Sequence, residues 1–209
     1  MSSLKLTLRA WPLIAILTIG LCYLTQLVAG WFGVELKEQM TVEQMRFMGT
    51  ETWKILTQQG LRAALTQEIS FKFIINIPLV IAILPFLEEC IFRGLLFKLP
   101  QRLFSRYGGE TPPPHSSPTS HSSPTSQSSP TSGRGRLAPV ALAIISSVLF
   151  SAAHYLQMPW PNDAFLALFF FGLAQCWLYR KTGHLWCAML NHGLFNLTNL
   201  VLLFILPEA

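Results

Sequence analysis

The chain has 209 residues, of which 51% are hydrophobic and only 12% are charged, and its formal net charge is +5. A soluble domain usually carries about 25% charged residues, so this composition argues against a soluble protein and favours several membrane spans. The basic excess is small and forms no dense patch, so nucleic-acid binding is not indicated.

Five apolar segments, each about as long as a bilayer is thick, follow one another along the chain. They are residues 10–32, 71–97, 137–156, 164–179 and 185–206. Lipid offers the backbone no hydrogen-bonding partner, so each is predicted to be a helix. The first could instead be a signal peptide, but its apolar run exceeds the roughly 7–15 residues of a signal core. The predicted fold class is an all-α, multi-span transmembrane bundle of about five spans with an interfacial amphipathic segment.

Two segments between the spans have their own character. After a first span in residues 1–33, residues 34–70 carry half of the acidic residues interleaved with apolar ones, which predicts amphipathic helices at the membrane interface. The alternative is a plain extramembrane loop. Residues 108–136 contain three copies of HSSPTS or QSSPTS and are predicted to be a disordered linker. It separates the two parts of the bundle, residues 71–107 and 137–206.

Basic residues flank the predicted spans unevenly, with the largest group between the second and third spans. The positive-inside rule then places the N-terminus inside and the C-terminus outside. We therefore expect an integral multi-pass protein, assigned to a bacterial plasma membrane. The inverted orientation is the alternative.

The stretch FLEECIFRG in the second span holds three charged residues in apolar surroundings. Ionisable groups inside a span are costly and therefore suggest function. On a helix, Glu89 and Arg93 are four residues apart and can pair. Glu88 points about 100° away from that pair, on the 3.6-residue period of a helix, and has no such partner. The alternatives are a packing cluster of all three, or an Arg93 that reaches the membrane surface.

Two further spans contribute imidazoles and an amide. His154 ends FSAAH in the third span, while His192 and Asn196 are four apart in the fifth. An imidazole and an amide on one helix face could direct two donors at one developing oxyanion. Hydrogen bonding between helices is the alternative role for each. Gly193 would let a neighbouring helix approach under either interpretation.

Together these residues are the groups that peptide hydrolysis needs: a carboxylate and an imidazole to activate water, and donors for the oxyanion. Glu88 can meet His154 only if the second helix continues to about Arg106, with a bend near Pro85. The ordered motifs EExxxR, FxxxH and HxxxN resemble those of the CPBP intramembrane proteases. This family includes CAAX prenyl endopeptidases and bacteriocin-processing and abortive-infection proteins. The resemblance covers roughly residues 80–206.

The resemblance implies a role for each polar residue. Glu88 and His154 would activate water, His192 and Asn196 would form the oxyanion site, and Glu89 and Arg93 would support them. No cofactor is firmly implied, because HExxH is absent. Zinc is the one candidate metal, with Glu88, His154 and His192 as its ligands. The implied partners are a peptide or protein substrate and membrane lipid.

Two other functions are alternatives to an intramembrane endopeptidase. One is a non-catalytic membrane protein of the same fold, active in bacteriocin immunity, peptide binding or as a sensor-kinase scaffold. The other is a small transporter that uses the carboxylates for proton coupling. A transporter usually shows an internal repeat, which this sequence lacks. The polar set on three spans favours the endopeptidase.

Overall fold

The computed structural model describes residues 2–36, 40–102, 134–157 and 161–205, with side chains described from residue 46 in the second range and from residue 139 in the third. Every regular element within these ranges is helical, which confirms the predicted all-α fold class. The elements are α1 (Ser3–Trp31), α2 (Met40–Thr66), α3 (Glu68–Pro78), η1 (Leu79–Ile83), α4 (Leu84–Glu89), η2 (Cys90–Lys98), α6 (Arg134–Gln157), α7 (Ala164–Thr182) and α8 (Leu185–Ile205).

The helix from Glu68 to Arg102 is one continuous element that includes two π-helical stretches, η1 and η2. A π-helical turn holds an extra residue and frees backbone carbonyls from the regular ladder. Pro78 and Pro85 lie at the two ends of η1 and donate no backbone hydrogen bond. The continuous helix that was expected is therefore present as far as the described residues extend, and its irregular turns lie next to the charged stretch.

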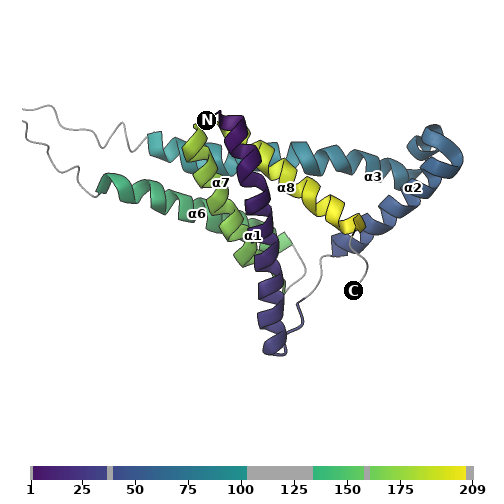
Figure 1. Cartoon of the computed structure of the whole chain (residues 1–209), viewed down its shortest axis with the longest axis horizontal. Helices are drawn as coiled ribbons and strands as arrows, with labels where there is room; N and C mark the ends of the chain where they lie inside the picture. Colours follow the sequence, from purple (N-terminus) through teal and green to yellow (C-terminus); the bar gives the residue numbers. More distant parts are fainter. Residues whose placement is uncertain (1, 37–39, 103–133, 158–160, 206–209) are drawn as a thin grey trace, which may run out of the picture.

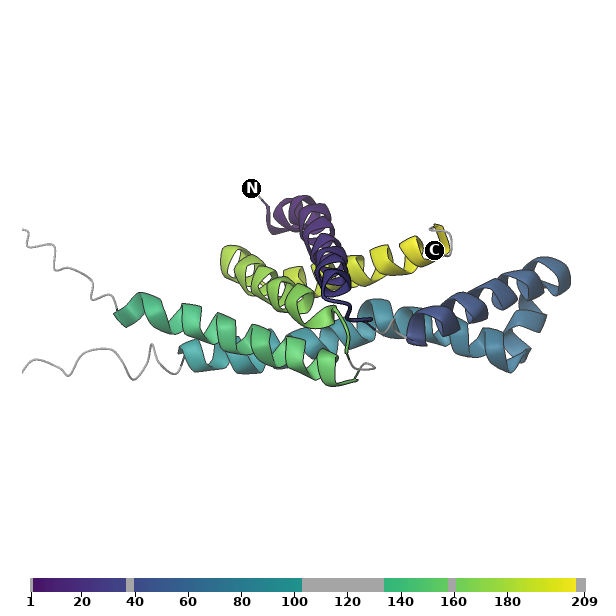
Figure 2. The same cartoon turned by 90° about the horizontal axis from the view of Figure 1, so that it is seen from below.

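Figures 1 and 2 show two layers of helices. One layer contains α6 beside the η2 end of the long helix, in opposite chain directions, and the α2–α3 pair at the far end. The other layer contains α1, α7 and α8, which cross over the first. The α7–α8 turn is tight because Gly183 has φ of 72° and its N–H donates to the Tyr179 carbonyl at 2.8 Å.

Within the described residues, four helical stretches are long and apolar enough to cross a membrane: α1, Glu68–Arg102, Pro139–Gln157 and α8. The predicted fourth span, now α7, is not among them: it is as long as Pro139–Gln157, but the polar and basic residues near its end, Arg180 and Lys181 among them, make it less apolar. It lies at the centre of the bundle, where it packs against α1, α6 and α8. The protein is thus an integral membrane protein with a multi-span bundle.

The predicted interfacial segment contains α2, which packs along α3 and touches the end of α8. Arg46 Nε donates to the Leu203 carbonyl at 3.0 Å, and the edge of the Phe204 ring lies against Gly49. The location of α2 at the membrane interface stays a prediction. The predicted Ser/Pro/Thr linker lies outside the described residues, except that α6 already begins at Arg134.

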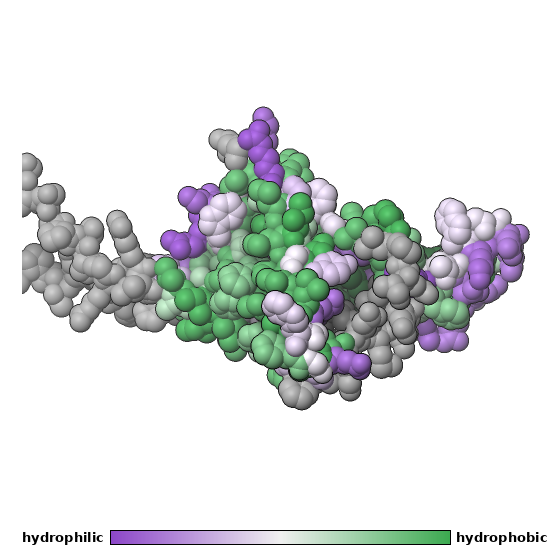
Figure 3. Space-filling view, turned by 60° about the horizontal axis from the view of Figure 1, so that its bottom comes forward, coloured by the Kyte–Doolittle hydropathy of each residue, from purple (hydrophilic) through white to green (hydrophobic). Residues whose placement is uncertain are grey.

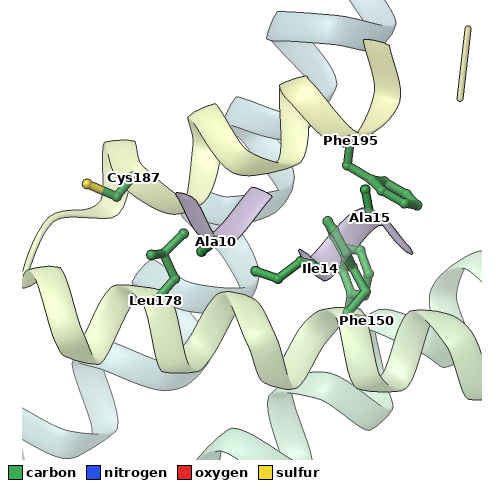
Figure 4. Packing of buried hydrophobic residues seen from close by; sticks show 8 residues of the cluster. Ala10, Ile14, Ala15, Phe150, Leu178, Cys187 and Phe195 are labelled. Carbon is green, nitrogen blue, oxygen red and sulfur yellow. The ribbon is translucent and has the colours of Figure 1, made fainter. Parts of the chain in front are cut away.

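Buried apolar side chains from α1, α6, α7 and α8 form the main core (Figure 4). Phe150, at 0% exposure, lies at one end of this cluster beside Ala15 and Phe195. Much of the outer surface is also apolar (Figure 3), as expected where lipid and not water is the solvent. The buried polar residues in this core are therefore the exceptions that need an explanation.

Candidate active site

Three helices bring the predicted polar residues together. Glu88 and Glu89 end α4, where the long helix changes to the π-helical η2. His154 lies one turn before the end of α6, and His192 lies in the first half of α8. Irregular π-helical turns occur frequently at functional sites, and here one begins directly after the two carboxylates.

The predicted Glu89–Arg93 pair is present and completely buried. Arg93 Nε lies 3.2 Å from Glu89 Oε2, and both side chains are 0% exposed. The contact is an ion pair without the alignment of a hydrogen bond. Arg93 Nη2 also donates to the Gly172 carbonyl at 3.2 Å. A buried guanidinium needs such compensation, because an unpaired buried charge costs several kcal/mol.

Phe150 provides an aromatic surface for this charge. Its ring centroid is 4.6 Å from Arg93 Cζ, a favourable cation–π distance. The same ring lies 4.4 Å from the His154 ring and 5.8 Å from the His192 ring, centroid to centroid. One buried side chain therefore contacts the guanidinium and both imidazoles.

Glu88 occupies a different environment from its neighbour Glu89. Its two oxygens face two imidazoles, with Oε1 3.6 Å from His154 Nε2 and Oε2 3.5 Å from His192 Nε2. The Glu88 side chain is 24% exposed, whereas that of Glu89 is not exposed at all. Glu88 is thus a carboxylate that lies between two imidazoles and that a reactant can reach. Glu88 and His154 therefore lie at the same depth in the bundle, as the proposed pairing of these residues required.

The Nδ1 atom of each imidazole is held by an oxygen. His154 Nδ1 lies 2.9 Å from the Phe150 carbonyl, and His192 Nδ1 lies 3.0 Å from Glu89 Oε1. A carbonyl or carboxylate only accepts, so we assign the hydrogen of each neutral ring to Nδ1. Both Nε2 atoms then present lone pairs toward Glu88. Because all three facing groups are acceptors, they suit a molecule that donates, such as water.

Asn196 is held by the long helix. Its Nδ2 donates to the Val80 carbonyl of η1 at 2.8 Å. One turn earlier, a Cβ on Gly193 would overlap the Ile81 carbonyl, so the two backbones touch there, as the sequence predicted. This contact uses one of the two amide hydrogens of Asn196. Its role as an oxyanion donor therefore stays a prediction.

Several supporting residues were not predicted. Ser146 donates to the Phe92 carbonyl of η2 at 2.7 Å, and the Phe171 ring lies 5.1 Å from the His192 ring. Gly172, which accepts from Arg93, packs so closely on Ser147 that a Cβ there would be crowded. The serines of ISSVLFS in an otherwise apolar helix were the signal that could have indicated this face.

The fit of a metal can be tested on the side chains themselves. In the part of the chain that the structure describes, no three His, Cys, Asp or Glu residues are grouped so that they could hold a metal ion. The predicted zinc set of Glu88, His154 and His192 therefore gains no support from the arrangement. No step below is derived through a metal.

An apolar pocket lies between two of the helices that carry the site. It has a volume of about 340 Å³ and lies between the η1–α4 part of the long helix and α8. Phe86, two residues before Glu88, and Gly193, next to His192, are both in its lining. Glu88, His154 and His192 are not in its lining, so the pocket shares two helices with the site but is not part of it.

A comparison with protein families identifies the chain. The family model for type II CAAX prenyl endopeptidases of the Rce1-like kind matches residues 70–198, well over half of the chain and all of the polar set. No curated protein and no solved structure matches it. The chain therefore belongs to the Rce1-like family of type II CAAX prenyl endopeptidases, and its function is of the CAAX-type intramembrane protease kind.

Proposed function

We propose that this protein is an intramembrane endopeptidase in which Glu88 and His154 activate a water molecule that hydrolyses a peptide bond. The observation that carries the proposal is the position of Glu88 between the Nε2 atoms of two imidazoles, at 3.6 and 3.5 Å. The neighbouring charged groups, Glu89 and Arg93, form a buried ion pair with each other, while Glu88 is partly exposed. A carboxylate in this position is suited to act as a general base.

The reaction follows from these acceptors. A water that donates one hydrogen to Glu88 and the other to His154 Nε2 directs its lone pair at the carbonyl carbon of the substrate. As the C–O bond forms, the water proton passes to Glu88, and the carbonyl oxygen becomes negative. Glu88 then delivers the proton to the amide nitrogen as the C–N bond breaks, which releases an amine and a carboxylic acid.

His192 and Asn196 would stabilise the oxyanion. For His192 to donate from Nε2 it must carry a second proton, and the buried carboxylate of Glu89 at its Nδ1 would stabilise that cation. Asn196 retains one amide hydrogen after its bond to the Val80 carbonyl. Arg93 holds Glu89 in position, so the Glu89–Arg93 pair supports the site without touching the substrate.

The substrate would be a peptide or protein segment that reaches the site from the lipid. The apolar pocket between the long helix and α8 would bind a hydrophobic side chain of that segment. Burial of one such side chain contributes about 1.5–3 kcal/mol, which is enough to position a peptide but not to hold it tightly.

The test is proteolysis of a peptide library by the purified protein and by Glu88→Gln. We expect Glu88→Gln to lower kcat by at least about a hundredfold, the usual contribution of a general base. Glu51→Gln, on α2 and remote from the site, is the matched control and should keep full activity. Wild-type activity in a folded Glu88→Gln variant would refute the assignment. A wild type that cleaves no peptide would favour the non-catalytic alternative.

A further inference from the structure

A second pocket lies away from the proposed active site, in a groove between α1 and α7. It has a volume of about 530 Å³. No residue of the long helix, of α6 or of α8 lines it, so it shares no element with Glu88, His154 or His192. Its lining is apolar except for one guanidinium, that of Arg9. Leu13 and Leu17, at 70% and 53% exposure, form an open wall.

The two helices of the groove run in opposite directions, which fixes what lies at each end. Gln26 Nε2 on α1 donates to Asp163 Oδ2, the residue before α7, at 2.8 Å. From this contact, the chain runs the same number of residues back along α1 to Arg9 as it runs forward along α7 to Arg180. With about 1.5 Å of rise per residue, the two arginines reach the same level. Figure 1 shows the start of α1 beside the end of α7 accordingly.

Basic side chains therefore gather at one end of the groove. Lys5 is one turn before Arg9 on the same face of α1, and Lys181 follows Arg180; all four residues are exposed. Trp177, which lines the groove, lies one turn below Arg180. Tryptophan and basic residues at the end of an apolar stretch are typical of the level of the lipid headgroups.

We infer that this groove binds one anionic glycerophospholipid, with an acyl chain along α1 and α7 and its phosphate at Arg9 and Arg180. An occupant that matches this groove is apolar over most of its length and negative at one end. Guanidinium groups bind phosphate oxygens well because they offer several donors in one plane. A neutral lipid such as phosphatidylcholine has the same phosphate, but the cation on its headgroup would be repelled by the four basic side chains.

The experiment is native mass spectrometry of the full-length protein, titrated with phosphatidylglycerol or with phosphatidylcholine of the same acyl chains. We expect phosphatidylglycerol to bind at least tenfold more tightly. Arg9→Gln should lower this preference about fivefold, the factor for ~1 kcal/mol per basic side chain. The matched control is Arg62→Gln, an exposed arginine on α2, which should change nothing.

A second variant tests the groove itself. Ala174→Phe, in the lining of the groove, should weaken both lipids, while a thermal melt checks that it folds. Equal binding of the two lipids by the wild type would overturn the inference, as would equal effects of Arg9→Gln and Arg62→Gln. A dimer that Ala174→Phe disrupts would instead assign the groove to a second copy. None of these measurements needs proteolysis, so their outcome is independent of the proposed function.

Discussion

The buried Glu89–Arg93 pair gives the sharpest prediction, because its two members have different second partners. Arg93→Met leaves Glu89 with only the His192 Nδ1 contact at 3.0 Å. Glu89→Leu leaves a fully buried guanidinium unpaired and also removes the acceptor of His192. Breaking a buried pair costs about 3–5 kcal/mol, and an unsatisfied buried donor adds about 1–3 kcal/mol. Glu89→Leu should therefore be the more destabilising change.

The double variant separates these contributions. With both charges replaced by apolar side chains of similar volume, no unpaired charge is left, and mainly the lost His192 contact should remain, at about 1–3 kcal/mol. The double variant should therefore be more stable than Glu89→Leu alone, with a coupling of at least about 2 kcal/mol.

The measurement is reversible unfolding in mixed micelles, followed by tryptophan fluorescence. The matched control is the exposed Glu68–Lys72 pair, which has the same four-residue spacing but 81% and 61% exposed side chains. Its cycle should show no measurable coupling, because exposed pairs are screened by solvent. If the Glu89 and Arg93 effects were simply additive, the buried pair would not stabilise the fold in the way described above.

Three further predictions concern other parts of the site. Gly193→Ala should destabilise the protein by about 1–3 kcal/mol, because the new methyl group meets the Ile81 carbonyl, whereas Gly20→Ala, with no atom nearby, should be neutral or stabilising in the same unfolding assay. Fluorinated phenylalanines at Phe150 should weaken the cation–π contact with Arg93 and lower kcat in steps that follow the number of fluorines; a flat series would contradict the contact. Treatment with a chelator, followed by desalting, should leave peptidase activity unchanged if the carboxylate and imidazoles act on water directly. Loss of activity that returns only when zinc is added would show instead that a metal activates the water.

The sequence predicted much of the architecture because membrane helices are encoded locally. Long apolar runs must be helical in lipid, so their existence needed no tertiary information. The pairing of Glu89 with Arg93 followed from their spacing, and the isolation of Glu88 followed from the same helix geometry. Charged groups in an apolar run are rare, which makes their chemical role visible before the fold is known.

The rest depended on contacts between helices, which no local pattern specifies. The Val80 carbonyl is open to Asn196 because the Leu84 N–H donates to Leu79 in the π-helical η1 and Pro85 has no N–H to donate. The π-helical turn itself has no compositional signature. The sequence therefore predicted a role for the Asn196 amide in the oxyanion site, beside His192, but not its hydrogen bond to the Val80 carbonyl. The FxxxH motif places Phe150 one turn before His154 but gives its ring no role, since only the meeting of α6 with the long helix and α8 places that ring against two imidazoles and a guanidinium.

The central position of α7 has a consequence for how the protein is made. A helix that ends in two basic residues and buries a fully enclosed glutamine, Gln175, is a poor substrate for insertion by itself during synthesis. Its neighbours in the sequence, α6 and α8, are apolar enough to insert independently. α7 should therefore insert into the bilayer late, together with α8 after α8 has been synthesised. Truncation before α8 would then leave α7 outside the membrane, and the imidazole of α6 without its partners.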